Sequence, residues 1–256
     1  MTPTPVPDVH CHLDQLADPE RAVEEALEAG VTPILAVGME QASSERALEL
    51  REKYPAALRV AVGLHPSEIP SLEAEELRAE LAFVEQTLRD ADALGEVGLD
   101  YRDAVDEEQR QRQRQALRQQ LEWAEHERKP LSMHCRRAEH EIVDLATQFV
   151  QRTALGVNLH WFTHSEKLAH VCGEKGIYIS PGPSILSSEP QASVARSIVP
   201  GYLLVETDSP VEFGGEPARP AWARKVAQAL ADLRGESLES LAQRLQENVE
   251  RYLRST

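Results

Sequence analysis

The segment Pro5-Val6-Pro7-Asp8-Val9-His10-Cys11-His12 decides the fold, because in it a short apolar run ends in side chains that can bind a cation. Two histidines that are two residues apart on an extended chain point to the same side. His10 and His12 are therefore expected to face one ion together. In parallel α/β proteins the chemistry lies at the carboxyl ends of the strands, which is where these residues stand.

Further apolar runs follow, each separated from the next by a charged amphipathic stretch. There are eight such runs in all. They are Pro5–Val9, Thr32–Val37, Leu58–Leu64, Ala93–Leu99, Leu131–His134, Val157–Trp161, Ile177–Ser180 and Tyr202–Val205. The stretches between them have helix signals, such as Asp18 as N-cap before Pro19 and Gly30 as terminator. We expect further helices from Ser71, over Asp103–Arg128, and from Ser237 to near Arg254. Alternating strands and helices predict parallel βαβ units.

The positions of the candidate ligands favour a closed barrel over an open doubly wound sheet. An open sheet gathers its ligands at one crevice where the strand order reverses. Here the candidates end runs one, four, five, six and eight, and only a closed ring brings the first and eighth ends together. The sequence therefore predicts a (β/α)₈ TIM barrel, as a single domain over residues 1–256.

Composition limits the class of protein. Apolar residues make up 41% of the 256 residues, charged residues 27%, and the formal net charge is −16. This charge argues against a broad basic surface for a nucleic-acid duplex, but it allows a few phosphates to be held locally. No run of about 18 apolar residues predicts a membrane span. Three cysteines without metal-finger spacing fit a reduced cytoplasmic setting. We expect a monomer, because no apolar surface stripe stands out.

Imidazole and carboxylate side chains recur at the ends of the runs. They are His10, His12, Glu96, His134, His160 and Asp208. Each one alone has a structural interpretation, such as a hydrogen-bonded histidine or a turn cap at Asp208. Together they exceed what one ion needs and predict two divalent ions. Such donors suit zinc or manganese, whereas magnesium prefers oxygen, so the choice among Zn²⁺, Mn²⁺ and Mg²⁺ stays open.

The order of the strands suggests how two ions would be shared. Glu96 is central in that order and is the natural bridge, with one oxygen for each ion. His10, His12 and Asp208 would hold the first ion, and His134 and His160 the second. Paired ions lower the pKa of a water between them, and Asp208 is then the expected base that takes its proton.

The set of motifs resembles the TatD family of metal-dependent deoxyribonucleases, within the amidohydrolase-like barrel superfamily. The resemblance runs over Asp8–Asp14, Gly63–Pro66, Gly95–Tyr101, His134–Arg136, His160–Phe162 and Glu206–Pro210. It implies a TIM-like barrel, two divalent ions and hydrolysis of phosphodiesters, often as a 3′–5′ exonuclease on DNA. It also implies the ligand role for the six residues above, and it places His65 near the substrate. Among the six, we expect Glu96 and Asp208 to be catalytic, as bridge and base.

Two further residues follow the ligands closely. Arg136 lies on the loop after the fifth run, where it would contact a phosphate or pair with Glu139. Trp161 follows His160 and would either wall the pocket or stack a base.

The substrate is less constrained than the chemistry, and three functions remain open. The first is a deoxyribonuclease that trims single strands or 3′ ends of DNA. The family commonly has Arg-Asn-x-Pro after the eighth strand, whereas this chain keeps only Arg219-Pro220. That departure leaves an acyl or amide hydrolase open, such as a lactonase or a D-aminoacyl-tRNA deacylase. A non-catalytic, metal-stabilised partner protein is the third.

Overall fold

Strands and helices alternate along the chain in the computed structural model, which describes residues 4–254, so both ends of the predicted domain 1–256 lie outside it. The main strands are β1 (Val6–Cys11), β2 (Val31–Val37), β3 (Leu58–Val62), β4 (Ala93–Asp100), β5 (Leu131–Arg136), β6 (Val157–His160) and β7 (Tyr178–Ser180). The α-helices are α1 (Pro19–Glu28), α2 (Gln41–Lys53), α3 (Ala74–Thr87), α4 (Glu107–His126), α5 (Glu139–Thr153), α6 (Glu166–Glu174), α7 (Glu189–Ser197), α8 (Ala223–Arg234) and α9 (Leu238–Tyr252).

Short elements complete the described chain. They are the 3₁₀ helices η1 (Leu13–Gln15), η2 (Leu88–Asp90), η3 (Pro183–Leu186), η4 (Pro200–Tyr202) and η5 (Pro220–Trp222), and the hairpin strands β8 (Glu212–Phe213) and β9 (Glu216–Pro217). No helix within residues 4–254 is both long and apolar enough to cross a membrane.

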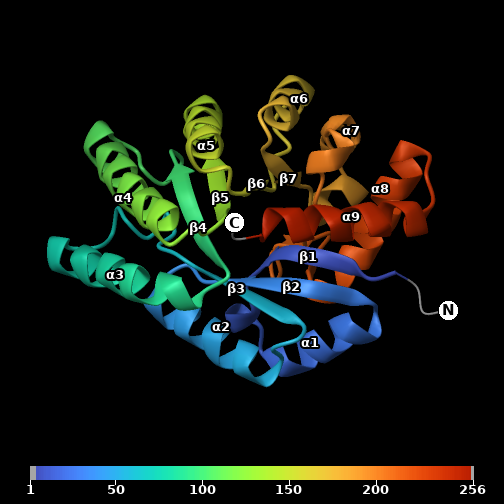
Figure 1. Ribbon diagram of the computed structural model, residues 1–256, viewed down its shortest axis with the longest axis horizontal. Coiled ribbons are helices and arrows are strands. Elements are labelled where there is room, and N and C mark those ends of the chain that lie inside the picture. The colour runs from blue at the N-terminus through green and yellow to red at the C-terminus, as the bar shows by residue number, and fades with distance from the viewer. Residues whose placement is uncertain (1–3, 255–256) are drawn as a thin grey trace.

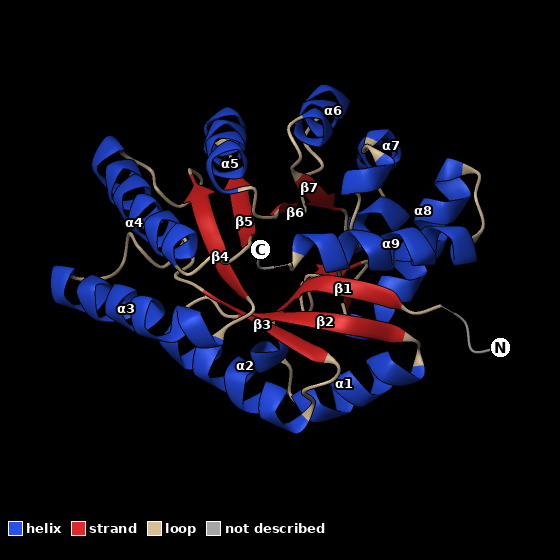
Figure 2. Cartoon of the chain, viewed as in Figure 1, coloured by secondary structure: helices blue, strands red, loops and turns tan. Residues whose placement is uncertain are grey.

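The strands form a parallel sheet in which β1 to β7 follow one another in chain order. Helices α1 to α8 lie outside the strands (Figures 1 and 2). The strongly apolar core fills the space between strands and helices, with residues such as Val23, Leu94 and Leu230 fully buried. This is the predicted α/β barrel, with the carboxyl ends of all its strands at one opening.

The eighth run differs from its predicted form. Tyr202 ends a 3₁₀ helix, and only Leu203 forms a bridge, to Ile179 of β7. The ring is nevertheless joined, because the N–H of Leu204 donates to Ile179 and the N–H of Val9 donates to Val205. We call residues 203–209 the closing segment.

A buried carboxylate fastens the closing segment to β1. Asp8 accepts from the Thr207 N–H at 2.9 Å and from the Thr207 hydroxyl at 2.6 Å. The N–H of Asp208 donates to the His10 carbonyl at 2.9 Å, and the N–H of His12 donates to the Ser209 carbonyl at 2.8 Å. The first and last parts of the ring therefore meet where the predicted ligands lie.

The helix signals in the sequence correspond to real caps. The Asp18 carboxylate accepts from the Arg21 N–H at 3.0 Å at the start of α1. Gly30, two residues after the end of α1, has φ +74°, a conformation that glycine adopts without strain. The helix predicted over Asp103–Arg128 is shorter, at Glu107–His126, because Asp106 provides the cap. Ser237 caps α9 as expected.

The last helix, α9, covers the end of the ring opposite the predicted site. Its Gln246 donates to the carbonyls of Pro5 and Thr32, which lie at the starts of β1 and β2. Its Tyr252 hydroxyl donates to the carbonyl of Leu131, the first residue of β5. Figure 1 shows α9 lying along β1. Helix α9 therefore closes the ring at the amino ends of the strands, and the predicted site lies at the opposite end.

Candidate metal centre

Two histidines of the opening segment point into the ring. His10 lies within β1 and His12 directly follows that strand, and both are buried. Their Nε2 atoms lie 3.3 Å and 3.4 Å from the same oxygen, Oε2 of Glu96. The same two nitrogens lie 3.8 Å and 3.4 Å from Oδ1 of Asp208. The pair predicted from the two-residue spacing therefore converges on two carboxylates.

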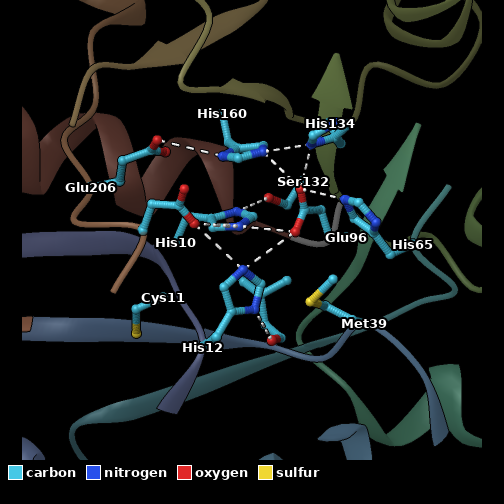
Figure 3. Close-up of polar contacts among 12 residues, drawn as sticks. His10, Cys11, His12, Met39, His65, Glu96, Ser132, His134, His160 and Glu206 are labelled. Carbon is cyan, nitrogen blue, oxygen red and sulfur yellow. Dashed lines mark hydrogen bonds and ion pairs between the residues drawn. The ribbon is translucent and has the colours of Figure 1, made fainter. Parts of the chain in front are cut away.

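The second oxygen of Glu96 faces a different set of histidines. Its Oε1 lies 2.8 Å from His134 Nδ1, 2.7 Å from His160 Nε2 and 3.2 Å from His65 Nε2. Figure 3 shows Glu96 surrounded by the labelled rings of His10, His12, His65, His134 and His160. The His160 ring stacks on that of His10, with centroids 3.9 Å apart, although the two rings face different oxygens of Glu96. All six predicted ligands thus lie in one cluster, and Glu96 divides it into two halves.

In three of the rings the second ring nitrogen has a partner of its own. His10 Nδ1 lies 3.0 Å from the Ser132 hydroxyl, and His12 Nδ1 lies 3.0 Å from the Val37 carbonyl. His134 Nε2 lies 3.0 Å from Asp100 Oδ2. Such partners fix the tautomer and the orientation of metal-binding histidines. The rings are therefore oriented before any ion arrives.

The remaining histidine, His160, has a buried carboxylate behind it. Its Nδ1 lies 3.5 Å from Oε1 of Glu206, and the other oxygen of Glu206 accepts from the Ser180 hydroxyl. Figure 3 shows Glu206 on the far side of His160 from Glu96. Neither Glu206 nor Asp100 was assigned a role from the sequence. For Glu206 a signal existed, since it precedes Asp208 by two residues, as His10 precedes His12.

Glycine in β4 allows the two halves to approach. Gly98 has φ +155°, and a Cβ there would lie 2.0 Å from the His134 carbonyl oxygen. An alanine would force β4 and β5 apart at the level of the site.

Charges in the cluster shift the pKa values in opposite directions. Burial raises the pKa of Glu96, but the surrounding histidines, His65 first, outweigh it and hold the pKa well below its usual range. Burial and the neighbouring His160 lower the pKa of His10 to about 4. Burial also lowers the pKa of His12, but the hydrogen bond to Asp208 and the charge of Glu96 raise it to about 9. Burial raises the pKa of Glu206 to about 7.

A cavity of about 560 Å³ opens above the cluster. His12, His65, Glu96, His134, His160 and Asp208 line it, together with Gln15, Met39, Cys135, Arg136, Trp161 and Val211. Arg136 is exposed at the end of β5. Both residues predicted to contact substrate, His65 and Arg136, therefore face the same space as the ligands. His65 lies deeper than predicted, in contact with Glu96 itself.

A family model described as TatD related DNase matches residues 7–254 of this chain. The chain belongs to the TatD family. It is therefore a metal-dependent hydrolase of that family, as the sequence motifs indicated.

Curated relatives and a solved structure cover nearly the whole chain. The metal-dependent hydrolase YjjV of Escherichia coli K12 is 32% identical over 94% of this chain and 95% of its own. The 3′-5′ ssDNA/RNA exonuclease TatD of Citrobacter rodentium is 29% identical over 91% of each. The crystal structure of E. coli YjjV superposes with a TM-score of 0.84, at 29% identity, over 96% of this chain and 97% of that one.

The cluster of this TatD-family chain has the chemistry that divalent ions require. Groups that could hold an ion are His10, His12 and Glu96; His65, Glu96 and His134; and His10, His160 and Glu206. The fully buried His10 Nε2 has no hydrogen-bond partner within the described residues. A buried polar atom without a partner is costly, and a cation opposite Glu96 would supply one. The residues present therefore fit metal ions.

Proposed function

We propose that this chain is a nuclease that removes nucleotides from 3′ ends of DNA with the help of two divalent ions. The observation that carries the proposal is Glu96, whose two oxygens each face a separate set of histidines. The name of the C. rodentium relative, a 3′-5′ ssDNA/RNA exonuclease, supports the choice of substrate. A human relative, 29% identical, is named Deoxyribonuclease TATDN3.

The proposed ligand sets follow the two halves of the cluster. His10, His12 and Asp208 would hold one ion, His134 and His160 the other, and Glu96 both. When bound, two divalent cations polarise a phosphoryl oxygen and make a water more acidic.

The chain itself supplies the proton acceptor and the contacts to substrate. Asp208 takes the proton of the attacking water; this residue lines the cavity, and its Oδ1 lies 3.4 Å from His12 Nε2. Water adds to phosphorus as the P–O bond to the 3′ oxygen of the remaining strand breaks. The nucleotide leaves with the phosphate, and the 3′ oxygen takes up the proton that Asp208 accepted. The Arg136 guanidinium neutralises a phosphate of the strand, because it is the only arginine or lysine among the described residues lining the cavity. His65 contacts the same phosphate region.

A nuclease assay with metal reconstitution tests the proposal. Protein stripped with a chelator is loaded with Zn²⁺, Mn²⁺ or Mg²⁺ and incubated with single-stranded DNA that is labelled at its 5′ end. We expect a ladder that shortens from the 3′ end with at least one metal and no cleavage without metal. No cleavage with any of the three metals contradicts the proposal.

Asp208→Asn is the matched variant for the base. Asp208 has φ +50°, and asparagine adopts this left-handed conformation readily, so the backbone is expected to persist. Loss of the base is expected to lower kcat by about 100-fold or more. Full activity in this variant excludes Asp208 as the base. Hydrolysis of an ester or a D-aminoacyl substrate in place of DNA would instead support the acyl hydrolase.

A further inference from the structure

Trp161 stands directly after His160 and is not used by the proposed chemistry. It lines the cavity together with His160, Asp208 and Val211. Its backbone has φ +44°, which is rare for a bulky residue that is not glycine. Strained backbone of this kind persists where the surrounding structure holds it and is found at functional sites. A large aromatic ring is thus held beside the reacting groups at a cost in backbone energy.

Hydrogen bonds fix the orientation of the indole ring. Its Nε1–H lies 3.1 Å from the Ser184 hydroxyl and 3.2 Å from Oε1 of Gln191. Thr163 also donates to the same Gln191 oxygen, at 3.0 Å. Ser184 belongs to η3 and Gln191 to α7, so separate elements hold the edge of the ring. The ring is consequently a rigid surface rather than a mobile side chain.

The hairpin β8–β9 supports the ring without stacking over it. Phe213 of β8 lies with its ring centroid 5.3 Å from that of Trp161, at an interplanar angle of 54°. A tilted contact leaves the indole faces less covered than a parallel stack would. Gly214 and Gly215, with φ +66° and +87°, form the turn that returns β9 alongside β8. Trp161 lines the cavity and Phe213 supports its ring, and we call this pair the Trp161–Phe213 corner.

Charge differs between Arg136 and the hairpin. Arg136 lies exposed at the end of β5 and lines the cavity, whereas the hairpin, which directly follows the cavity residue Val211, carries the exposed carboxylates Glu212 and Glu216. A phosphate is attracted to Arg136 and repelled by the two carboxylates. A flat neutral group near the hairpin meets no such repulsion. A nucleotide combines these two chemistries, with an anionic phosphate and an uncharged aromatic base.

We propose that Trp161 is a specificity-determining residue that stacks a base of the substrate nucleotide while its phosphate faces Arg136. The inference rests on the proposed nuclease function and adds to it the element that recognises an unpaired base. Every base has a π face, so the corner accepts all four bases. The base must leave the duplex stack to reach the ring, which disfavours an end that is fully paired.

A double-mutant cycle between protein and substrate tests this inference. Trp161→Leu keeps an apolar side chain without a π face, and Trp161→Phe keeps a smaller one. The substrates are a single-stranded oligonucleotide and two versions with an abasic nucleotide at the last or the next-to-last 3′ position. We expect Trp161→Leu to lower kcat/KM on the normal strand between about 5-fold and about 150-fold, the range of one stacked base.

The abasic substrates separate stacking from a structural role. On one of the two, Trp161→Leu is expected to cost less than about twofold, because the base that it would stack is already missing. Trp161→Phe is expected to lose less than Trp161→Leu on the normal strand. Trp222 lies on η5, outside the cavity, so Trp222→Leu is expected to leave kcat/KM unchanged on all three substrates. Equal losses by Trp161→Leu on all three substrates overturn the inference.

A binding measurement keeps the inference testable if the chain cleaves no DNA. A deoxynucleoside monophosphate stacked on the indole is expected to quench tryptophan fluorescence in the wild type and in Trp222→Leu, with saturation. The quenching is expected to disappear in Trp161→Leu. Quenching without any cleavage would refute the nuclease but support the stacking surface. Cleavage without quenching would support the nuclease and overturn the role of Trp161.

Discussion

At the scale of single residues, the centre depends on one carboxylate that would be costly in any other setting. Glu96 is buried inside the ring, where an ionised group without partners is strongly disfavoured. It remains ionised because histidines surround both oxygens and lower its pKa. The same arrangement that stabilises the charge also presents one oxygen to each half of the cluster. The surrounding histidines therefore explain both why Glu96 can be buried as a carboxylate and why it could bridge two ions.

Glu206 allows a test of how strongly a residue behind a predicted ligand affects the affinity for metal ions. Glu206→Gln keeps the size of the side chain but removes the carboxylate behind His160, 3.5 Å from its Nδ1. Loss of such a partner typically weakens metal binding about 10- to 100-fold. Competition with a chromogenic chelator measures the affinity, and Glu174→Gln, exposed on α6, is the matched control. Unchanged affinity would show that His160 does not need Glu206 for its orientation.

That the six predicted ligands lie together could be predicted from the sequence for a geometric reason. Parallel strands bring their carboxyl ends to one opening, so His10, His12, His134 and His160 had to converge once the barrel was assumed. Asp100 had no comparable signal, and Glu206 had only its two-residue spacing from Asp208, because a carboxylate near a strand end serves equally well in a turn. Each of these carboxylates lies beside the second ring nitrogen of a histidine. Whether it does so depends on the orientation of the imidazole ring, which is set by packing.

At the scale of elements, β4 has to approach β5 closely for the two halves to meet. Gly98→Ala would place a Cβ 2.0 Å from the His134 carbonyl oxygen on a backbone with φ +155°. We expect a loss of about 2–4 kcal/mol in the free energy of unfolding, because strain and steric overlap act together. Urea denaturation measures it.

A glycine without these constraints provides the control. Gly201 has no atom within 4 Å of a built Cβ, so Gly201→Ala is expected to leave stability nearly unchanged. Equal stability of the two alanine variants would show that β4 and β5 can separate without cost.

The eighth run shows where element prediction fails. Its composition resembles that of the other runs, yet only Leu203 bridges to β7. The closing segment is held by individual bonds instead, including Asn248 of α9, which donates to the Leu203 carbonyl at 2.7 Å. The run is followed by Asp208 in the left-handed conformation and by a proline at 210, neither of which continues a regular strand. A pattern of apolar residues predicts that a segment is buried, but it does not predict that its backbone forms a continuous set of hydrogen bonds with the neighbouring strand.

At the scale of the whole molecule, the negative net charge opposes the binding of DNA, whereas the fold provides a site where a strand could bind locally. A chain with a formal net charge of −16 repels DNA as a whole at long range. Within residues 4–254, the cavity that contains the ligands is lined by a single arginine and no lysine. Bound ions would supply the rest of the positive charge, at the point of reaction. Recognition is therefore expected to be local, covering one or two phosphates.

Salt dependence measures the extent of that contact. For single strands the logarithm of the affinity falls with the logarithm of the salt concentration by roughly 0.7 per phosphate neutralised. Contact with one or two phosphates predicts that affinity falls only about three- to sevenfold between 50 mM and 200 mM salt. Fluorescence anisotropy of a labelled oligonucleotide on metal-loaded Asp208→Asn gives the affinity, and Arg136→Gln is expected to flatten the slope further. A slope corresponding to six or more phosphates would mean that a basic surface outside this cavity guides the strand, and that the local arrangement around Glu96, Arg136 and Trp161 is only part of the binding site.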